Sequence, residues 1–344
     1  MAILANKKSK EELLRDLAKE NFKRIIISFY RYVPISEPHK LRDELFLKWS
    51  ELRCLGRIYL AKEGINAQMN VPEPQWDAFI SHLYSYPEFN GIHVKRAVEE
   101  KNISFYKLIV KVRKKIVADG IDDPNFNPSL TGQYLNAEEF NRMLDRPDVI
   151  VVDMRNHYES KVGRFEKAIC PDAETFREEI PKVTELLKGK ENQPILMYCT
   201  GGIRCEKASA YLRYKGFKEV YHLRGGIIQY AHELKSKGLS SRFKGLNFVF
   251  DERLGERITD DVLANCHTCG KPCDRYINCK NDACHLLFIQ CEECEAKMNG
   301  CCCESCREIS LLPLEVQKEL RRKKKKINLP ADIKLHQEMT EVQS

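Results

Sequence analysis

The segment "QPILMYCTGGIRCEKASAYLRYKG" (residues 193–216) joins an apolar stretch to a polar one through a Gly-Gly pair. The apolar part, which predicts a buried strand, ends at Cys199. Gly201 and Gly202 let the chain turn sharply into a predicted helix that ends at Gly216. Cys199 is therefore expected at the carboxyl end of a strand, where the reactive groups of parallel sheets gather.

The flanking sequence repeats this alternation. "NAEEFNRMLDRPD" and "AETFREEIPKVTELLKG" predict helices, although Pro181 is expected to kink or split the second. "VIVVDMR" predicts a strand, and "FKEVYHLRGGIIQYAHELKSKG" predicts a strand, a Gly-Gly turn and a helix. Residues 135–240 are thus predicted to form an α/β domain with a parallel sheet covered on both faces.

Residues 1–120 predict a different fold. A short helix capped by Ser9 comes first, and strands and helices then follow in the order β-α-β-β-α-β, which is typical of a ferredoxin-like α+β sandwich. The predicted elements span residues 24–33, 36–52, 54–61, 64–71, 73–86 and 91–98. Residues 121–134, near a cluster of Asp, Asn and Pro, are predicted to be a linker.

The loop after Cys199 has the composition of an anion-binding site. A tight strand-to-helix loop leaves backbone N–H groups without partners, and the helix dipole and Arg204 add positive charge. A thiol there should ionise below its usual pKa of about 8.5 and face an open cleft as a nucleophilic thiolate. A buried core cysteine would explain neither the glycines nor Arg204. The predicted active-site loop comprises Thr200, Gly201, Gly202, Ile203, Arg204 and Cys205.

This loop resembles that of rhodaneses, which are sulfurtransferases. "VVDMRNHYESKVGRFEKAI" (151–169) and "LRGGI" (223–227) extend the resemblance. The resemblance implies that the cysteine can carry a persulfide and that Asp153 and Arg155 support the loop. Thr200 stands where many thiosulfate-using rhodaneses have arginine, which weakens the case for thiosulfate as donor. Cys205 is either a small buried helix residue or a partner that resolves oxidised Cys199 as a disulfide.

Eleven of the fifteen cysteines lie between residues 266 and 306, in a predicted metal-binding domain at 241–312. Three Cys-x-x-Cys pairs favour structural zinc, with an iron–sulfur cluster as the rival. The sequence does not fix the pairing; we favour one site from Cys266, Cys269, Cys291 and Cys294, and another from Cys279, Cys284, Cys303 and Cys306. Residues 313–344 predict a charged helix and a polar tail.

The charge distribution suggests a polyanion partner. The net charge is +7, residues 101–117 hold six basic residues and no acidic one, and 321–326 read "RRKKKK". The alternative is a solvated face and a disordered tail. The candidate nucleic-acid contacts are Lys107, Lys111, Arg113, Lys114 and Lys115. Neither a signal peptide nor an apolar run of membrane-spanning length is apparent, so we expect a cytoplasmic protein without a membrane partner.

Several segments, in order, resemble the bacterial rhodanese-containing tRNA uridine hydroxylases: "AKEGINAQMNV", "KVRKKIVADGIDDP", "VDMRNHYESKVGRF", "MYCTGGIRCEKAS" and "NFVFDERLGERI". The resemblance implies oxygen-dependent hydroxylation of the wobble uridine at C5, with Cys199 as the reactive residue, tRNA as partner and dioxygen as co-substrate. The alternatives are a sulfurtransferase that relays persulfide sulfur from Cys199, and a non-catalytic zinc and tRNA-binding module.

The chemistry of hydroxylation does not follow from the sequence motifs. The chain shows no flavin or haem fingerprint and no 2-His-1-carboxylate spacing, so the electron donor and the route of oxygen activation stay open, as do protein partners. One hypothesis is that the Cys199 thiolate attacks C6 of uracil, which would make C5 electron-rich.

Overall fold

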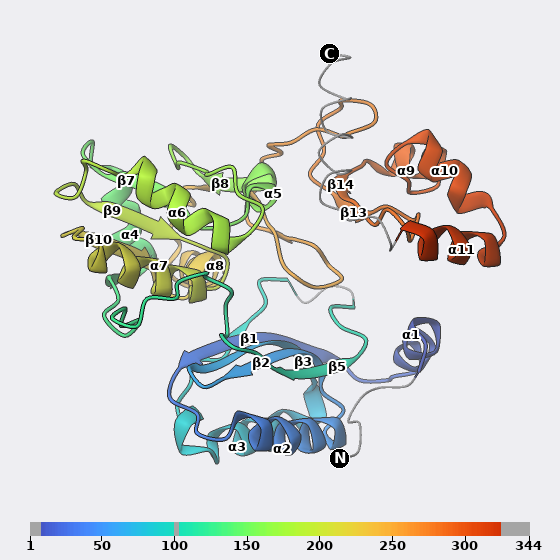
Figure 1. Ribbon diagram of the computed structural model, residues 1–344, viewed down its shortest axis with the longest axis horizontal. Coiled ribbons are helices and arrows are strands. Elements are labelled where there is room, and N and C mark those ends of the chain that lie inside the picture. The colour runs from blue at the N-terminus through green and yellow to red at the C-terminus, as the bar shows by residue number, and fades with distance from the viewer. Residues whose placement is uncertain (1–7, 100–102, 325–344) are drawn as a thin grey trace. The chain divides into compact units, whose positions relative to one another are not determined.

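The computed structural model describes residues 8–99 and 103–324. These residues form two compact units, with the boundary between Asp261 and Val262. The first unit runs from blue to gold in Figure 1, and the second is orange to red. Within the described ranges, no helix combines the length and the apolar character needed to cross a membrane.

The N-terminal part of the first unit has the predicted ferredoxin-like fold. Its elements are β1 (Arg24–Tyr32), α2 (Pro38–Glu51), β2 (Leu55–Ala61), β3 (Gly64–Pro72), α3 (Trp76–Tyr84) and β4 (Lys95–Arg96). The strand order β4-β1-β3-β2 is the one that this connectivity produces, which confirms the α+β prediction. An unpredicted fifth strand, β5 (Leu108–Val112), lies parallel to β2 at the edge. Helices α2 and α3 cover one face of the sheet (Figure 1).

Local sequence explains most element boundaries here. Helix α1 (Lys10–Ala18) begins after Ser9, whose side chain accepts a hydrogen bond from the Glu12 amide, as the Ser-x-x-Glu spacing predicted. The helix predicted over 73–86 starts as a 3-10 turn, η1 (Glu73–Gln75), and a second turn, η2 (Pro87–Phe89), follows it. The strand predicted over 91–98 shrinks to β4, because only its two residues pair with β1.

The second part of the first unit has the predicted parallel sheet. Its strands are β6 (Gln133–Leu135), β7 (Ile150–Asp153), β9 (Ile195–Tyr198) and β10 (Val220–Leu223), in the order β6-β10-β9-β7 and all parallel. Its helices are α4 (Ala137–Leu144), α5 (His157–Val162), α6 (Phe176–Leu186), α7 (Ile203–Tyr214) and α8 (Gly226–Lys237). Pro181 lies inside α6 without splitting it, and β6 begins within the segment predicted as a linker.

Side-chain alternation along the strands builds one core on each face of this sheet. Met197 points into a cluster with residues of α6 and α7, whereas its neighbours Leu196 and Tyr198 point into a cluster with α4 and α8. Because both faces are covered, the strands are apolar at nearly every position. This arrangement fixes the end of β9, and with it the position of Cys199.

The segment after α8 belongs to the first unit and not to the cysteine-rich segment with which the sequence grouped it. Strand β11 (Phe243–Asn247) pairs antiparallel with both β8 (Gly163–Phe165) and β12 (Glu256–Arg257). Phe243 is fully buried in the core that α4 and α8 share. An apolar strand therefore precedes the cysteines, and the first compact unit extends to Asp261, whereas the sequence predicted that the metal-binding domain starts at residue 241.

A buried network of charges joins the two parts of the first unit. Lys207 of α7 donates to Glu63, between β2 and β3, at 2.7 Å, and lies 2.6 Å from a carboxylate oxygen of Asp119. Asp119 also accepts from Lys115 at 2.6 Å. The side chains of Lys207 and Asp119 are almost fully buried, so each charge depends on its partners.

The second unit is small and contains most of the cysteines. It consists of β13 (Tyr276–Asn278), β14 (Leu287–Ile289), α9 (Glu292–Met298), α10 (Glu304–Leu311) and α11 (Leu314–Lys324). Strands β13 and β14 form an antiparallel pair. Its hydrophobic cluster contains Phe288 and several cysteines, so little apolar surface is buried. The end of the basic block 321–326 and the predicted tail lie outside the described residues.

Beneath Cys199, a buried ion pair supports the end of the parallel sheet. Arg155 and Asp153 are both fully buried, and two guanidinium nitrogens donate to the carboxylate at 2.8 and 2.7 Å. The Tyr198 hydroxyl donates to the same carboxylate at 2.7 Å. Because Tyr198 directly precedes Cys199, the pair fixes the backbone from which the loop starts.

We predict that Asp153→Ala lowers the free energy of unfolding by about 3–5 kcal/mol, because it leaves the Arg155 guanidinium buried without its counter-charge. Urea unfolding followed by circular dichroism measures the change. Asp148→Ala is the matched control, because it removes a carboxylate that pairs with Arg146 at the surface, and it should leave the midpoint nearly unchanged. Equal midpoints for the two variants would contradict a structural role of the buried pair.

Candidate active site

The loop that follows β9 is held by backbone contacts to the start of α8. The carbonyl oxygens of Cys199 and Thr200 accept hydrogen bonds from the amides of Ile227 and Ile228 at 3.0 and 3.2 Å. Gly226 makes this approach possible: its φ is +69°, and an added Cβ would lie 2.5 Å from the Cys199 oxygen. The Gly-Gly pair at 225–226 therefore presses directly against the reactive loop.

The Cys199 sulfur is surrounded by donors. The Gly202 amide donates to Sγ at 3.1 Å. Burial opposes ionisation, but a hydrogen bond from the Cys205 thiol, the charge of Arg204 and the amides of Cys205 and Gly202 outweigh it and lower the pKa of Cys199 to about 6. Burial and the neighbouring Cys199 raise the pKa of the Cys205 thiol, so Cys205 stays protonated and acts as a donor.

The predicted exposure of this sulfur is wrong. Cys199 has no exposed surface, whereas the sequence predicted a sulfur facing an open cleft. The reason is that Cys199 belongs to the hydrophobic cluster that the sheet forms with α6 and α7. The amides nevertheless point inward, toward the sulfur, as the anion-site hypothesis requires.

Arg204 acts on the sulfur from within an ion pair. Its guanidinium donates to both oxygens of Glu159, at 2.6 and 2.8 Å. The Thr200 hydroxyl also donates to Glu159, at 3.0 Å. All three side chains are at least nine-tenths buried, so this carboxylate orients both the arginine and the residue that follows Cys199.

Sequence reasoning missed Glu159. It lies 45 positions before Arg204, on a helix that was not predicted, and no motif links the two. One signal was present, because Asn156 and Glu159 have the Asn-x-x-Glu spacing of a capping box. The Glu159 carboxylate accepts a hydrogen bond from the backbone N–H of Asn156 at 3.1 Å. That spacing indicates a helix start, but not the ion pair with Arg204.

A cleft of about 1160 Å³ lies beside the loop, with Thr200, Gly201, Ile203 and Arg204 in its wall. Residues of β1, β2 and β3 and the segment 249–256 form other parts of the wall. Aromatic side chains on which a nucleobase could stack also line it, namely Tyr30, Tyr59, Phe105, Phe176 and Phe250. The cleft is large enough for a nucleotide with part of its neighbours.

The five residues predicted to contact nucleic acid differ in their exposure and in whether their charge is paired. Arg113 and Lys114 are exposed and line the cleft, and Lys111 is exposed on β5. Lys107 lies 5.5 Å from the ring centroid of Tyr106. Lys115 also lines the cleft, but its ammonium group is paired with Asp119, so most of its charge is already balanced.

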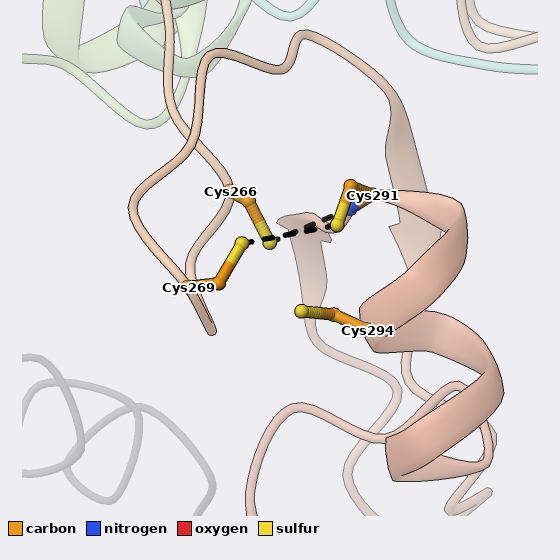
Figure 2. Close-up of side chains that lie close together, drawn as sticks. All are labelled: Cys266, Cys269, Cys291 and Cys294. Carbon is orange, nitrogen blue, oxygen red and sulfur yellow. Dashed lines mark hydrogen bonds between the residues drawn. The ribbon is translucent and has the colours of Figure 1, made fainter.

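Eight cysteine sulfurs of the second unit form two groups of four. The sulfurs of Cys266, Cys269, Cys291 and Cys294 lie within 4.8 Å of one another, which is the first set that the sequence favoured. Figure 2 shows these side chains facing a common centre, with Cys291 and Cys294 coming from the start of α9. The sulfurs of Cys269 and Cys291 are 3.9 Å apart.

The second group corrects one predicted ligand. It consists of Cys279, Cys284, Cys302 and Cys306, so Cys302 takes the place assigned to Cys303. The Cys302 sulfur lies 3.7 Å from that of Cys284 and 3.8 Å from that of Cys306. The Cys-x-x-Cys spacing misled the assignment. Cys303 is the N-cap of α10, whereas the ligand group uses Cys302, which precedes the N-cap, and Cys306, which lies in the first turn of the helix.

Family comparisons cover nearly the whole chain. Residues 24–116 match the UPF0176 acylphosphatase-like domain, 136–233 match the rhodanese-like domain and 244–307 match the rhodanese C-terminal domain. Curated relatives include proteins named tRNA uridine(34) hydroxylase. The one from Enterobacter sp. (strain 638) is 52% identical over 322 residues, covering 93% of this chain and 92% of the relative. The one from Leptospira interrogans is 53% identical over 321 residues, covering 93% and 88%.

We predict that the Cys199 thiol titrates near pH 6, and that its pKa rises in the double variant Arg204→Met with Glu159→Gln, because the arginine charge that favours the thiolate is lost. Removing both charges avoids a buried, unpaired carboxylate. The measurement is the ¹³Cβ shift of labelled cysteine against pH, assigned with Cys199→Ser.

Arg213→Met is the control for this titration, because it removes a charge from the exposed side of the same helix. Its Cys199 pKa should equal that of the unmodified protein. An unchanged pKa in the double variant would show that the amides and Cys205 alone hold the thiolate.

Proposed function

Because the chain belongs to the tRNA uridine(34) hydroxylase family, we propose that it hydroxylates the wobble uridine of tRNA at C5. Dioxygen is the co-substrate, Cys199 is the reactive residue, and the cytoplasm, where tRNA is modified, is the site of action. The observation that carries this proposal is the position of the Cys199 sulfur, which accepts a hydrogen bond from the Gly202 amide in a loop whose next residue, Thr200, lines a nucleotide-sized cleft.

The composition of the cleft supports tRNA as the partner. Arg57, Arg113, Lys114 and Arg177 line it and can contact phosphates. Arg253 lines it too, but Asp251 and Glu256 pair with its guanidinium at 2.6 Å each, so its charge is balanced within the protein. A single-stranded anticodon base presented to such a cleft can stack on its aromatic side chains.

The thiolate provides a route to activate uracil. Addition of Sγ to C6 forms a carbon–sulfur bond, and the electron pair of the C5–C6 double bond moves toward C5 and the O4 carbonyl. C5 then becomes the nucleophilic carbon that takes one oxygen atom of dioxygen, while the second oxygen atom leaves as water, which requires two protons and two electrons from an external reductant. Loss of the C5 proton and expulsion of the thiolate restore the double bond. Because Cys199 is fully buried, the cleft wall must move before Sγ can contact the base.

The cysteine groups of the second unit fit two structural zinc ions. A tetrahedral site with zinc–sulfur bonds of about 2.3 Å places its sulfurs about 3.8 Å apart. Three sulfur pairs in these groups, at 3.9, 3.7 and 3.8 Å, match this spacing. An iron–sulfur cluster is larger than one ion and would hold its cysteines farther apart. Bound metal would then replace the apolar core that this unit lacks.

We predict that tRNA from cells carrying Cys199→Ser in place of this protein lacks 5-hydroxyuridine and its derivatives at position 34, because serine does not form an anion at neutral pH. Nucleoside mass spectrometry of purified tRNA measures this. Cys170→Ser, a change at a cysteine outside the loop, should leave the modification in place.

Two outcomes would count against the hydroxylase. Full 5-hydroxyuridine in Cys199→Ser would remove Cys199 from the reaction. Intact 5-oxyuridine derivatives together with the loss of a thiolated nucleoside would favour sulfur relay from the same cysteine.

We also predict that Cys302→Ser halves the zinc content, from two ions per chain to one, whereas Cys303→Ser keeps both, because only Cys302 belongs to a four-sulfur group. Atomic emission analysis of the purified variants measures the ratio, and chelation should unfold residues 262–324. Zinc loss in Cys303→Ser alone, or an iron-rich protein without zinc, would contradict this assignment.

A further inference from the structure

A lysine from the N-terminal sheet contacts the reactive loop. Lys95 lies on β4, and its side chain is buried, with 5% of the residue exposed. Its ammonium group donates to the Gly201 carbonyl at 2.8 Å and lies 4.7 Å from the ring centroid of Tyr30. Lys95 also lines the cleft that contains Thr200 and Arg204.

The position of Lys95 follows from strand pairing. Lys95 is opposite Ser28 in the antiparallel pair of β1 and β4. Because side chains alternate along a strand, Ser28, Tyr30 and Tyr32 share one face of β1. Tyr32 donates to the Ile203 carbonyl at 3.2 Å, and the Tyr30 hydroxyl lies 2.7 Å from where a Cβ on Gly202 would be. This face of the sheet therefore contacts the loop at Gly201, Gly202 and Ile203.

The surroundings of the ammonium group are electrostatically unbalanced. In the described part of the chain, the Gly201 carbonyl is the single acceptor within hydrogen-bond distance of Nζ. Burial lowers the pKa of Lys95 to about 8, and the negative charges of Cys199 and Glu206 raise it. Lys95 is thus mostly protonated at neutral pH, although an isolated buried ammonium is costly. A nearby anion is what makes this charge tolerable.

We propose that Lys95 is a positioning residue of the reactive centre, through which the N-terminal domain orients the loop at Gly201 and supplies positive charge that favours the anionic sulfur of Cys199. This inference rests on the proposed function only in taking Cys199 as the reactive residue. The N-terminal domain then has a second role besides contributing to the cleft, because it helps to set the ionisation of a cysteine in another domain.

The rival explanation is that Lys95 only packs between the domains. A purely structural lysine would affect stability but not the titration of the sulfur. Other charged or titratable groups near the loop stay in place in every variant below. They include Tyr30 and Tyr32 of β1, Glu159 of α5, Glu179 of α6, and Arg204, Cys205 and Glu206 of α7.

The test is the ¹³Cβ titration of Cys199 in Lys95→Met, which keeps most of the volume and removes the charge. We expect the pKa of Cys199 to rise by about one unit, the lower end of the effect of a nearby opposite charge. At pH 6.5 such a rise, from 6 to 7, lowers the thiolate fraction about threefold, and kcat/KM for tRNA hydroxylation should fall by the same factor. Lys95→Arg, which restores the charge, should recover most of the low pKa.

Arg96→Met is the matched control. Arg96 is the next residue of β4, its side chain is exposed, and it packs over Trp76, away from the loop. The Cys199 pKa should not change there. Lys95→Gln keeps a donor for Gly201 without the charge, so it separates charge from hydrogen bonding and replaces Lys95→Met if that variant does not fold.

An unchanged Cys199 pKa in Lys95→Met or Lys95→Gln would overturn the proposal, as would an equal rise in Arg96→Met. A rise in Lys95→Arg as large as in Lys95→Met would mean that packing, and not charge, matters. The titration needs no tRNA, so a protein without hydroxylase activity would sink the proposed function and leave this measurement intact.

Discussion

The Cys199 sulfur has no contact with solvent, and yet its surroundings favour the anion. Burial alone would keep the thiol protonated, because a charge in an apolar interior loses its hydration. Backbone amides at the start of α7, the Cys205 thiol and Arg204 replace that hydration with fixed dipoles and charge. Such groups need no reorganisation when a reaction begins, which is the advantage of a preorganised site over water. The Gly-Gly pairs at 201–202 and 225–226 permit the close backbone packing around this sulfur.

The buried charge of Arg204 needs a counter-ion, but that counter-ion must leave its effect on the Cys199 sulfur in place. Arg204 is buried, so it requires a carboxylate, and Glu159 binds it in a bidentate geometry. That pairing fixes the guanidinium in place while its field still reaches the sulfur. Glu159 in turn holds Thr200, so one carboxylate organises the loop from outside it.

Local patterns predicted what local forces determine. Apolar strands ending at Cys199, the glycines of the loop and the capped α1 were all readable, because each depends on neighbours in the chain. The partners of Arg204 and Lys115 were not readable, because Glu159 and Asp119 meet them only through the tertiary fold. Cys303 was preferred over Cys302 for the same reason: spacing suggests a ligand pair, but the direction of each side chain at the start of α10 decides it.

The contact of Lys207 with Glu63 and Asp119 bears on how such a protein can arise. The Lys207 cation lies on α7 of the parallel-sheet domain, and both of its counter-ions lie in the part of the chain that precedes this domain. A copy of the parallel-sheet domain moved to another gene would carry the Lys207 cation without its counter-ions. Selection should therefore transmit the two domains as one hereditary piece.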